Sequence, residues 1–88
     1  MKKTFILLVS SLLILTSCKD SAEEYSKIGY SKYILTDFKG AIADFTKAIE
    51  INPNDAVYYY KRGLSKNELK DYKGAISDYT RAIEPLIR

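Results

Sequence analysis

Two stretches of the chain carry apolar residues at the same helical spacing. The first stretch has Ala41, Ile42, Phe45, Ala48 and Ile49, and the second has Ala75, Ile76, Tyr79, Ala82 and Ile83. Positions i, i+1, i+4, i+7 and i+8 form one stripe along a helix of 3.6 residues per turn. Ahead of the first stretch, Tyr25, Ile28, Gly29 and Leu35 share a helical face, where the glycine allows close approach of a partner helix. The pattern predicts an all-α fold with helices over residues 22–35, 38–51, 53–69 and 72–84.

One sequence unit occurs twice. When the chain is aligned with itself at an offset of 34 residues, 17 of the 33 pairs between residues 22–54 and 56–88 are identical. A fixed period of this length is typical of repeat proteins, whose units bury a continuous core by stacking. The sequence therefore predicts two tandem units, residues 22–54 and 55–88, each made of two helices.

Short polar residues mark the predicted helix ends. Asp37 and Asp71 stand at the breaks within the units, where a carboxylate accepts hydrogen bonds from the free amides of the next helix. Between the units, we expect Asn52 to be an N-cap and Pro53 to occupy the first helical position, with Asp55 near the positive helix end.

The opening segment has the order of an export signal. Lys2 and Lys3 precede an apolar run over residues 5–15, which is too short for a spanning helix of about 20 residues but suits a signal peptide. The following Leu15-Thr16-Ser17-Cys18 resembles the lipobox of bacterial lipoproteins. The resemblance implies a signal peptide over residues 1–17, a diacylglyceryl group on Cys18 and a short tether over residues 18–21. An ordinary secretory signal or an uncleaved helix is the alternative.

The residue after the lipobox bears on location. Many Gram-negative lipoproteins with Asp after the modified Cys stay in the inner membrane, whereas this chain has Lys19. The resemblance therefore implies a lipid-anchored protein of the cell envelope, in the outer membrane of a Gram-negative bacterium, on either its periplasmic or its surface side. Two or three acyl chains would hold it there, since each buried methylene contributes about 0.8 kcal/mol.

Composition and charge remove several classes of function. The chain has no His and one Cys, which excludes His-ligated metal sites, Ser-His and Cys-His nucleophiles and a disulfide framework. Its net charge is +3, but from Cys18 onward 12 Lys and Arg face 11 Asp and Glu, so no nucleic-acid partner is indicated. The repeated Asp37, Asp44, Asp71 and Asp78 are interpreted as caps and solvated faces. We expect no enzyme activity, no metal and no cofactor beyond the lipid on Cys18.

The body resembles the tetratricopeptide repeat family. The motif residues are Tyr25, Ile28, Gly29, Ala41, Phe45, Ala48 and Pro53 in the first unit and Tyr59, Gly63, Ala75, Tyr79 and Ala82 in the second. The resemblance implies a short α-solenoid of two helix-turn-helix repeats. Three features depart from the family pattern: Lys32 and Lys66 replace an aromatic, Arg62 replaces an apolar residue, and Pro85 lies two positions early. We therefore expect looser packing of the first helix of the second unit.

Such repeats commonly receive a peptide segment of a partner protein on a concave face made by the first helix of each pair. On this chain the face is expected to carry Glu23, Ser26, Tyr30, Tyr33, Val57, Tyr60, Leu64 and Asn67. Tyrosine suits this task because it offers contact area and one hydrogen bond at small rotamer cost. The prediction is a protein–protein interaction module with a Tyr-rich groove and an unidentified protein or peptide partner.

Two repeats are few for a stacked array, which usually needs about three units and a polar cap. The second unit ends at Pro85-Leu86-Ile87-Arg88 and is therefore expected to be incomplete or uncapped. This leaves three further hypotheses: a homo-oligomer formed through the uncapped repeat, a structural piece that stacks end to end on itself or on a larger membrane complex, and a truncated part of a longer repeat protein.

Overall fold

The computed structural model describes residues 21–87 of the 88-residue chain. The predicted signal peptide over residues 1–17 and the predicted lipid-bearing Cys18 lie outside these residues. The described part is helical: a first helix that includes residues 21–34, then α2 (Phe38–Ile51), α3 (Ala56–Glu68), α4 (Tyr72–Ile83) and a short 3-10 helix, η1 (Glu84–Leu86). The predicted all-α fold of tandem helical hairpins is confirmed. None of the helices between residues 21 and 87 combines the length and apolar character that crossing a bilayer requires.

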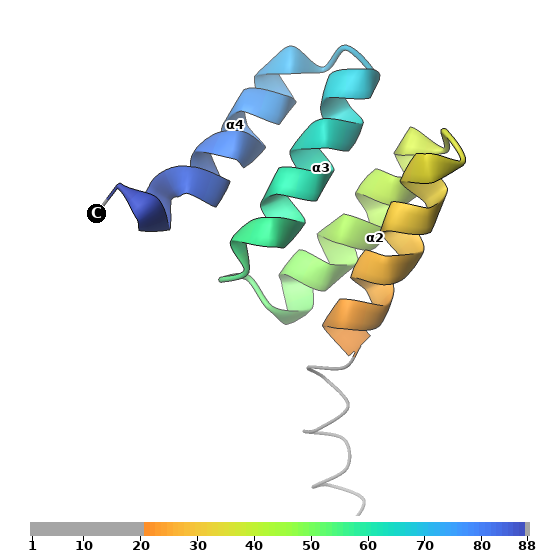
Figure 1. The fold of residues 1–88 in the computed structure, drawn as a ribbon, viewed down its shortest axis with the longest axis horizontal. Coiled ribbons are helices and arrows are strands. Elements are labelled where there is room, and N and C mark those ends of the chain that lie inside the picture. Colours follow the sequence, from red (N-terminus) through yellow and green to blue (C-terminus); the bar gives the residue numbers. More distant parts are fainter. Residues whose placement is uncertain (1–20, 88) are drawn as a thin grey trace, which may run out of the picture.

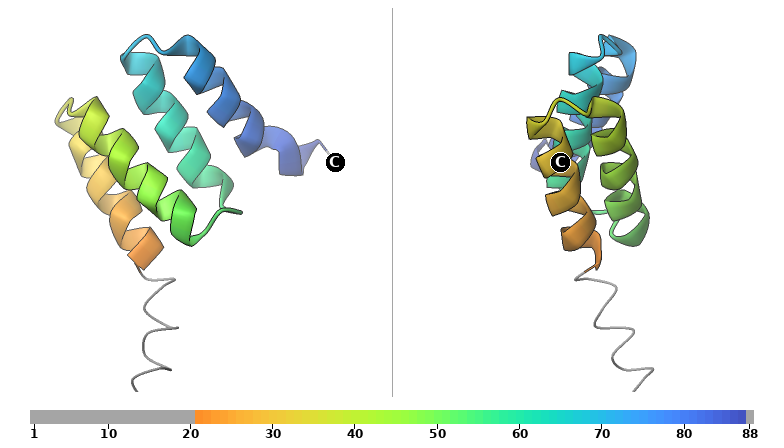
Figure 2. Two further views of the ribbon diagram at one scale, coloured as in Figure 1. Left: turned by 180° about the vertical axis from the view of Figure 1, so that it is seen from behind. Right: turned by 90° about the vertical axis from the view of Figure 1, so that its right-hand side faces the viewer.

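The helices follow one another in an antiparallel zigzag (Figure 1). The first helix pairs with α2, α3 packs beside α2, and α4 packs against α3. Because every turn reverses the chain direction, the start of the first helix, the α2–α3 loop and the end of α4 lie toward one end of the molecule (Figure 2). The two short turns within the hairpins lie at the other end.

Both hairpins are closed by the same turn. Thr36 and Lys70 adopt the left-handed backbone conformation, with φ of 66° and 65°. In the first turn the Thr36 amide donates to the Tyr33 carbonyl (3.0 Å) and the Asp37 amide donates to the Lys32 carbonyl (2.8 Å). These are the two hydrogen bonds of a Schellman motif, and the second turn repeats both of them. The residues of the two units thus close their hairpins with the same backbone geometry.

The residue after each of these turns starts the next helix. The Asp37 carboxylate accepts a hydrogen bond from the Gly40 amide (3.0 Å), and the Asp71 carboxylate accepts one from the Gly74 amide (3.1 Å). Both residues are therefore N-caps, as the sequence predicted. The start of α2 at Phe38 and of α4 at Tyr72 follows from these caps.

The loop between the units differs from the prediction. Asn52 ends α2 as its C-cap, and α3 begins at Ala56 rather than at Pro53. Asp55 is the N-cap, since its carboxylate accepts a hydrogen bond from the Val57 amide at 2.9 Å. The prediction was wrong here because two capping residues, Asn52 and Asp55, were available and the later one was used.

Close contact at two glycines joins the helices of each hairpin. A Cβ atom on Gly29 would lie 3.0 Å from a ring carbon of Phe45, and one on Gly63 would lie 2.7 Å from a ring carbon of Tyr79. Only glycine permits this approach of ring and backbone. The expected looser packing of the second hairpin is therefore not found at its glycine, where the contact is the tighter of the two.

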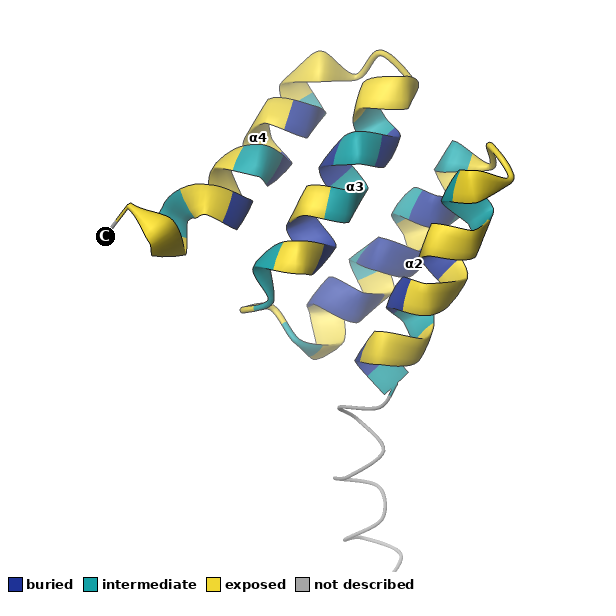
Figure 3. Cartoon of the chain, viewed as in Figure 1, coloured by how far each residue is buried: buried dark blue, intermediate teal, exposed yellow. Residues whose placement is uncertain are grey.

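The apolar stripes of α2 and α4 differ in how far they are covered. Ile49 of α2 is 9% exposed, because α3 lies over it, whereas the matching Ile83 of α4 is 49% exposed. Ile42 is half-buried and its counterpart Ile76 is exposed. Figure 3 shows buried positions on the side of α4 that faces α3 and exposed positions on its outer side. The apolar stripe of α4 is thus only partly covered within the described residues.

The apolar face predicted for the first helix is only partly buried. Gly29 is buried and Tyr25 is half-buried, but Ile28 and Leu35 are exposed. Leu35 is exposed because the first helix ends at residue 34 and Leu35 belongs to the turn.

Candidate functional site

Four tyrosines from three helices gather across both repeats. Tyr30 and Tyr33 of the first helix have nearly parallel rings whose centroids lie 6.3 Å apart, with an angle of 11° between the planes. The rings of Tyr60 of α3 and Tyr79 of α4 lie 5.9 Å apart. We call Tyr30, Tyr33, Tyr60 and Tyr79 the tyrosine face.

The electrostatics of these phenols link the two pairs. Partial burial raises the pKa of Tyr33, and the nearby Glu68 carboxylate and the phenols of Tyr30 and Tyr60 raise it further. Burial also raises the pKa of Tyr79, followed by the effects of Tyr60 and Tyr33. Tyr33 is thus within electrostatic reach of Tyr60, and Tyr79 of Tyr33, which indicates one continuous face. The raised pKa keeps the hydroxyls of Tyr33 and Tyr79 protonated, so that both can donate hydrogen bonds throughout the neutral pH range.

Two charged side chains border this face. The Lys61 ammonium lies 5.1 Å from the centroid of the Tyr30 ring, within the range of a cation–π contact. This contact joins α3 to the first helix. Glu68, at the end of α3, is exposed and close enough to influence the pKa of both Tyr33 and Tyr79. The border thus carries one positive and one negative group.

The eight residues that were predicted to line a groove differ in position and burial. Tyr30, Tyr33 and Tyr60 come together, and Val57, Leu64 and Asn67 are exposed or half-buried on α3. Ser26 is 2% exposed, so its assignment to the groove was wrong: its short side chain is enclosed within the packed helices. The Glu23 carboxylate accepts a hydrogen bond from the Tyr58 hydroxyl (3.1 Å) and so joins the two repeats.

Tyr79, Lys61 and Glu68 were missed as site residues. The sequence placed Tyr79 on the apolar stripe of its helix, but it is half-buried, whereas the matching Phe45 is fully buried. The exchange of Phe for Tyr between matching positions was the available signal, since an added hydroxyl favours a half-exposed position. In the sequence, Lys61 and Glu68 follow the polar pattern of an exposed helix side. That pattern did not indicate that Lys61 lies over the Tyr30 ring or that Glu68 lies near Tyr33.

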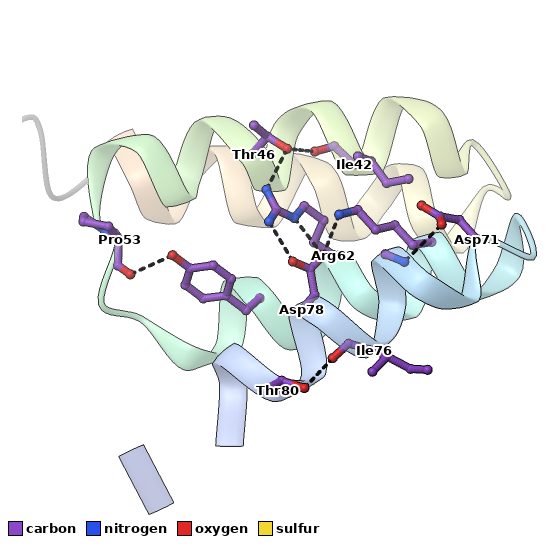
Figure 4. A network of polar contacts seen from close by, with 11 residues as sticks. Ile42, Thr46, Pro53, Arg62, Asp71, Ile76, Asp78 and Thr80 are labelled. Atoms are coloured by element: carbon purple, nitrogen blue, oxygen red, sulfur yellow. Dashed lines mark hydrogen bonds and ion pairs between the residues drawn. The ribbon is translucent and has the colours of Figure 1, made fainter. Parts of the chain in front are cut away.

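A largely buried ion cluster connects α3 to its neighbouring helices (Figure 4). The Arg62 guanidinium donates two hydrogen bonds to the Asp78 carboxylate of α4 (2.8 and 2.7 Å) and one to the Thr46 hydroxyl of α2 (3.2 Å). The Lys66 ammonium lies 3.0 Å from the same carboxylate. Arg62 therefore connects three helices and both repeats, and it accounts for the departure from the family pattern at this position.

Asp78 is the centre of this cluster. Burial alone would raise the pKa of its carboxyl, but hydrogen bonds from Arg62 and Lys66, and their positive charges, lower that pKa below 3.8. In the first repeat the matching Asp44 pairs with Lys32 at 2.9 Å. The interpretation of Asp44 and Asp78 as solvated was wrong, because both are buried and ion-paired.

The tyrosine face offers groups suited to the recognition of another molecule. Between residues 21 and 87, no three His, Cys, Asp or Glu side chains gather so that they could hold a metal ion. What the tyrosine face presents is ring surface, four phenol hydroxyls and one charge of each sign at its border. These groups suit contact with another polypeptide.

Comparisons with known proteins agree with the repeat geometry. A family model described as TPR repeat matches residues 29–69, and one described as tetratricopeptide repeat matches residues 56–84. No curated protein matches the chain. The matched regions overlap, together cover well over half of the sequence, and include both glycine contacts and both capped turns. With its two tandem helical hairpins, the chain belongs to the tetratricopeptide repeat family.

Proposed function

We propose that this chain is an interaction module that binds an extended segment of a partner protein on the tyrosine face. Tetratricopeptide repeats generally mediate binding between proteins and act as non-catalytic scaffolds. The observation that carries the proposal is the convergence of Tyr30, Tyr33, Tyr60 and Tyr79 across both repeats. No reaction is assigned to the chain.

The chemistry of the face favours a partner segment with apolar or proline side chains. Aromatic-lined surfaces bind such segments because ring faces pack against them while hydroxyls donate to backbone carbonyls. Tyrosine loses little rotamer freedom on binding, so the ordering cost is small. Lys61 and Glu68 balance one another at the border and give no preference for a strongly charged partner.

The proposal places this module at a membrane. Lys2, Lys3, the apolar run over residues 5–15 and the lipobox ending at Cys18 support export and lipidation. On this proposal Cys18 carries the lipid in the cell envelope, with Lys19 permitting transport to the outer membrane. Only residues 19–20 then separate the anchor from the described part of the first helix, so the interaction module lies close to the lipid surface.

Photo-crosslinking tests the tyrosine face. A photoreactive phenylalanine derivative at position 30 should capture a partner, and the purified partner should then bind the chain in calorimetry. Tyr30→Ala should weaken that affinity at least about tenfold, equivalent to roughly 1.4 kcal/mol. Tyr72→Ala is the matched control, because Tyr72 is 56% exposed, comparable to Tyr30 at 47%, but lies outside the face. Equal losses from both variants, or none from Tyr30→Ala, would contradict the proposal.

Intact mass tests the anchor separately. Protein purified from its native membrane should have the mass of residues 18–88 plus two or three acyl chains. An unmodified full-length mass would refute the lipid anchor while leaving the binding face untouched. The two parts of the proposal therefore succeed or fail independently.

A further inference from the structure

The two repeats provide an internal standard for how one unit covers the next. Residues 34 apart occupy matching positions, so a residue that is buried in one repeat and exposed in the other marks the interface between repeats. On the covered side of the first repeat these residues are Phe45 and Ile49, whose counterparts Tyr79 and Ile83 are half-buried and exposed. The side of α3 and α4 that points away from the first repeat therefore has the form of a stacking surface.

The same comparison, applied to the first helix and α3, identifies the surface that would pack on a preceding repeat. Tyr58 and Ser65 of α3 are buried against the first repeat, whereas the matching Glu24 and Ser31 of the first helix are exposed. Ile28 is also exposed, and its counterpart Arg62 forms the contact to Thr46. The outer side of the first helix thus matches the side of α3 that packs on a neighbouring repeat.

A hollow marks the receiving site on the open side. It has a volume of about 400 Å³ and is lined by residues that include Ala56, Tyr59, Arg81 and Glu84. In the first repeat, the position matching Ala56 is Ala22, which packs in one cluster with Tyr58 of the next repeat. The hollow therefore lies where the first residues of a following helix pack in the internal interface.

We propose that a second copy of this chain stacks head to tail on the first, with its first helix placed on α4 and the end of α3 as α3 is placed on α2. The second copy's Glu24 then takes the position of Tyr58, beside the hollow that Arg81 lines. Arg81 is largely exposed and its only ion pair among the described residues is a long one of 3.9 Å to Glu84. The two charges complement one another, and Ile28 of the second copy covers Thr80 as Arg62 covers Thr46.

One position distinguishes this junction from the internal one. Ser26 is enclosed in the first repeat, whereas its counterpart Tyr60 is exposed and its ring packs beside that of Tyr79. The larger ring opposes close approach of another helix, so the junction between copies is weaker than the junction within a chain. Stacking also covers part of the tyrosine face, and a bound partner segment therefore competes with a second copy.

The test uses the full-length chain, purified in detergent and treated with a short bismaleimide. Chains with Ile28→Cys are mixed with chains with Thr80→Cys, because the matching pair Arg62 and Thr46 is in direct contact. We expect crosslinked dimers in the mixture and ladders when one chain carries both cysteines. The parent chain measures any reaction of Cys18 itself, so failure of the lipid-anchor proposal is detected separately from failure of stacking.

Further variants fix the geometry. Ile83→Glu should reduce crosslinking several-fold. Ile34→Glu should not, because Glu68, which matches Ile34, stays exposed where α3 packs on the first repeat. Tyr60→Ser should increase crosslinking several-fold. Circular dichroism establishes that each variant is folded. Dimers from Thr80→Cys chains alone would overturn head-to-tail stacking in favour of a two-fold pair, and absence of crosslinks in the mixture would overturn association altogether.

Discussion

Substitution of Asp78 is the most direct way to test whether the buried ion cluster stabilises the fold. Asp78→Asn keeps the shape of the side chain but removes its charge, leaving Arg62 and Lys66 opposite a neutral amide. The Asp78 side chain is 3% exposed, whereas those of Arg62 and Lys66 are 17% and 21% exposed. The carboxylate is therefore the only fully enclosed member of the cluster, and both cations keep some contact with water.

The magnitude follows from this geometry. Removing one member of a buried ion pair usually costs about 3–5 kcal/mol. Because both cations retain partial hydration, we expect the free energy of unfolding to fall by about 2–3 kcal/mol for Asp78→Asn. The matched control is Asp44→Asn in the first repeat, where the partner Lys32 is 39% exposed. That pair is closer to a surface salt bridge, so its loss should cost clearly less than the loss of the Asp78 charge.

Urea unfolding followed by circular dichroism at 222 nm measures these differences. A domain of this size has little stability to lose, so a stabilising osmolyte can bring the least stable variant into a measurable range. Arg62→Ile introduces the residue of the matching position 28 and completes a double-mutant cycle with Asp78→Asn. The double variant should lose less than the two single losses added together, with a coupling of about 1.5–3 kcal/mol. Equal losses for Asp78→Asn and Asp44→Asn, or additive losses in the cycle, would refute the reasoning.

Three further predictions concern pH and backbone. The pKa of Asp78 is lowered in the folded state, so its contribution to the free energy of unfolding is complete above the ordinary value of 3.8 and is lost as the pH falls below it. Below that pH, the free energy of unfolding should therefore fall less steeply in Asp78→Asn than in the parent. Burial, the hydrogen bond to Glu23 and nearby negative charge raise the pKa of Tyr58 to about 12. Its folded state therefore holds the proton more tightly, and stability should fall as the pH rises from 10 toward 12, less steeply in Tyr58→Phe. Lys70→Gly should raise the free energy of unfolding by roughly 0.5–1 kcal/mol, seen as a higher urea midpoint, since glycine adopts the left-handed conformation without strain. Lys73→Gly inside α4 should lower the midpoint.

Much of the fold could be predicted because its determinants are local. The 34-residue period located both hairpins, and Asp37 and Asp71 marked the starts of α2 and α4, since a cap acts on amides within three residues. The start of α3 was predicted three residues early because Asn52 and Asp55 are both good caps. Only the path of the loop decides between them.

The candidate site could be predicted only in part because its determinants are long-range. Tyr30, Tyr33 and Tyr60 followed from helical spacing, but the enclosure of Ser26 depends on how closely the helices pack. Asp78 looks like a surface residue in sequence, and its partners lie one helix away. A polar residue conserved between two copies of one unit is compatible with either a solvated or a paired position, and the pairing becomes visible only when the helices are placed together.

Arg62 also affects the order in which the two units pack on one another. Two units of similar sequence face the danger of wrong pairing, in which equivalent helices exchange places within a chain. The matching residue of the first unit is Ile28, which has no hydrogen-bonding group in its side chain. The contact from Arg62 to Thr46 therefore forms where α3 of the second unit packs on α2 of the first, and Ile28 cannot replace it. A single departure from the repeat thus distinguishes the junction within the chain from any junction in which the first unit packs on the second.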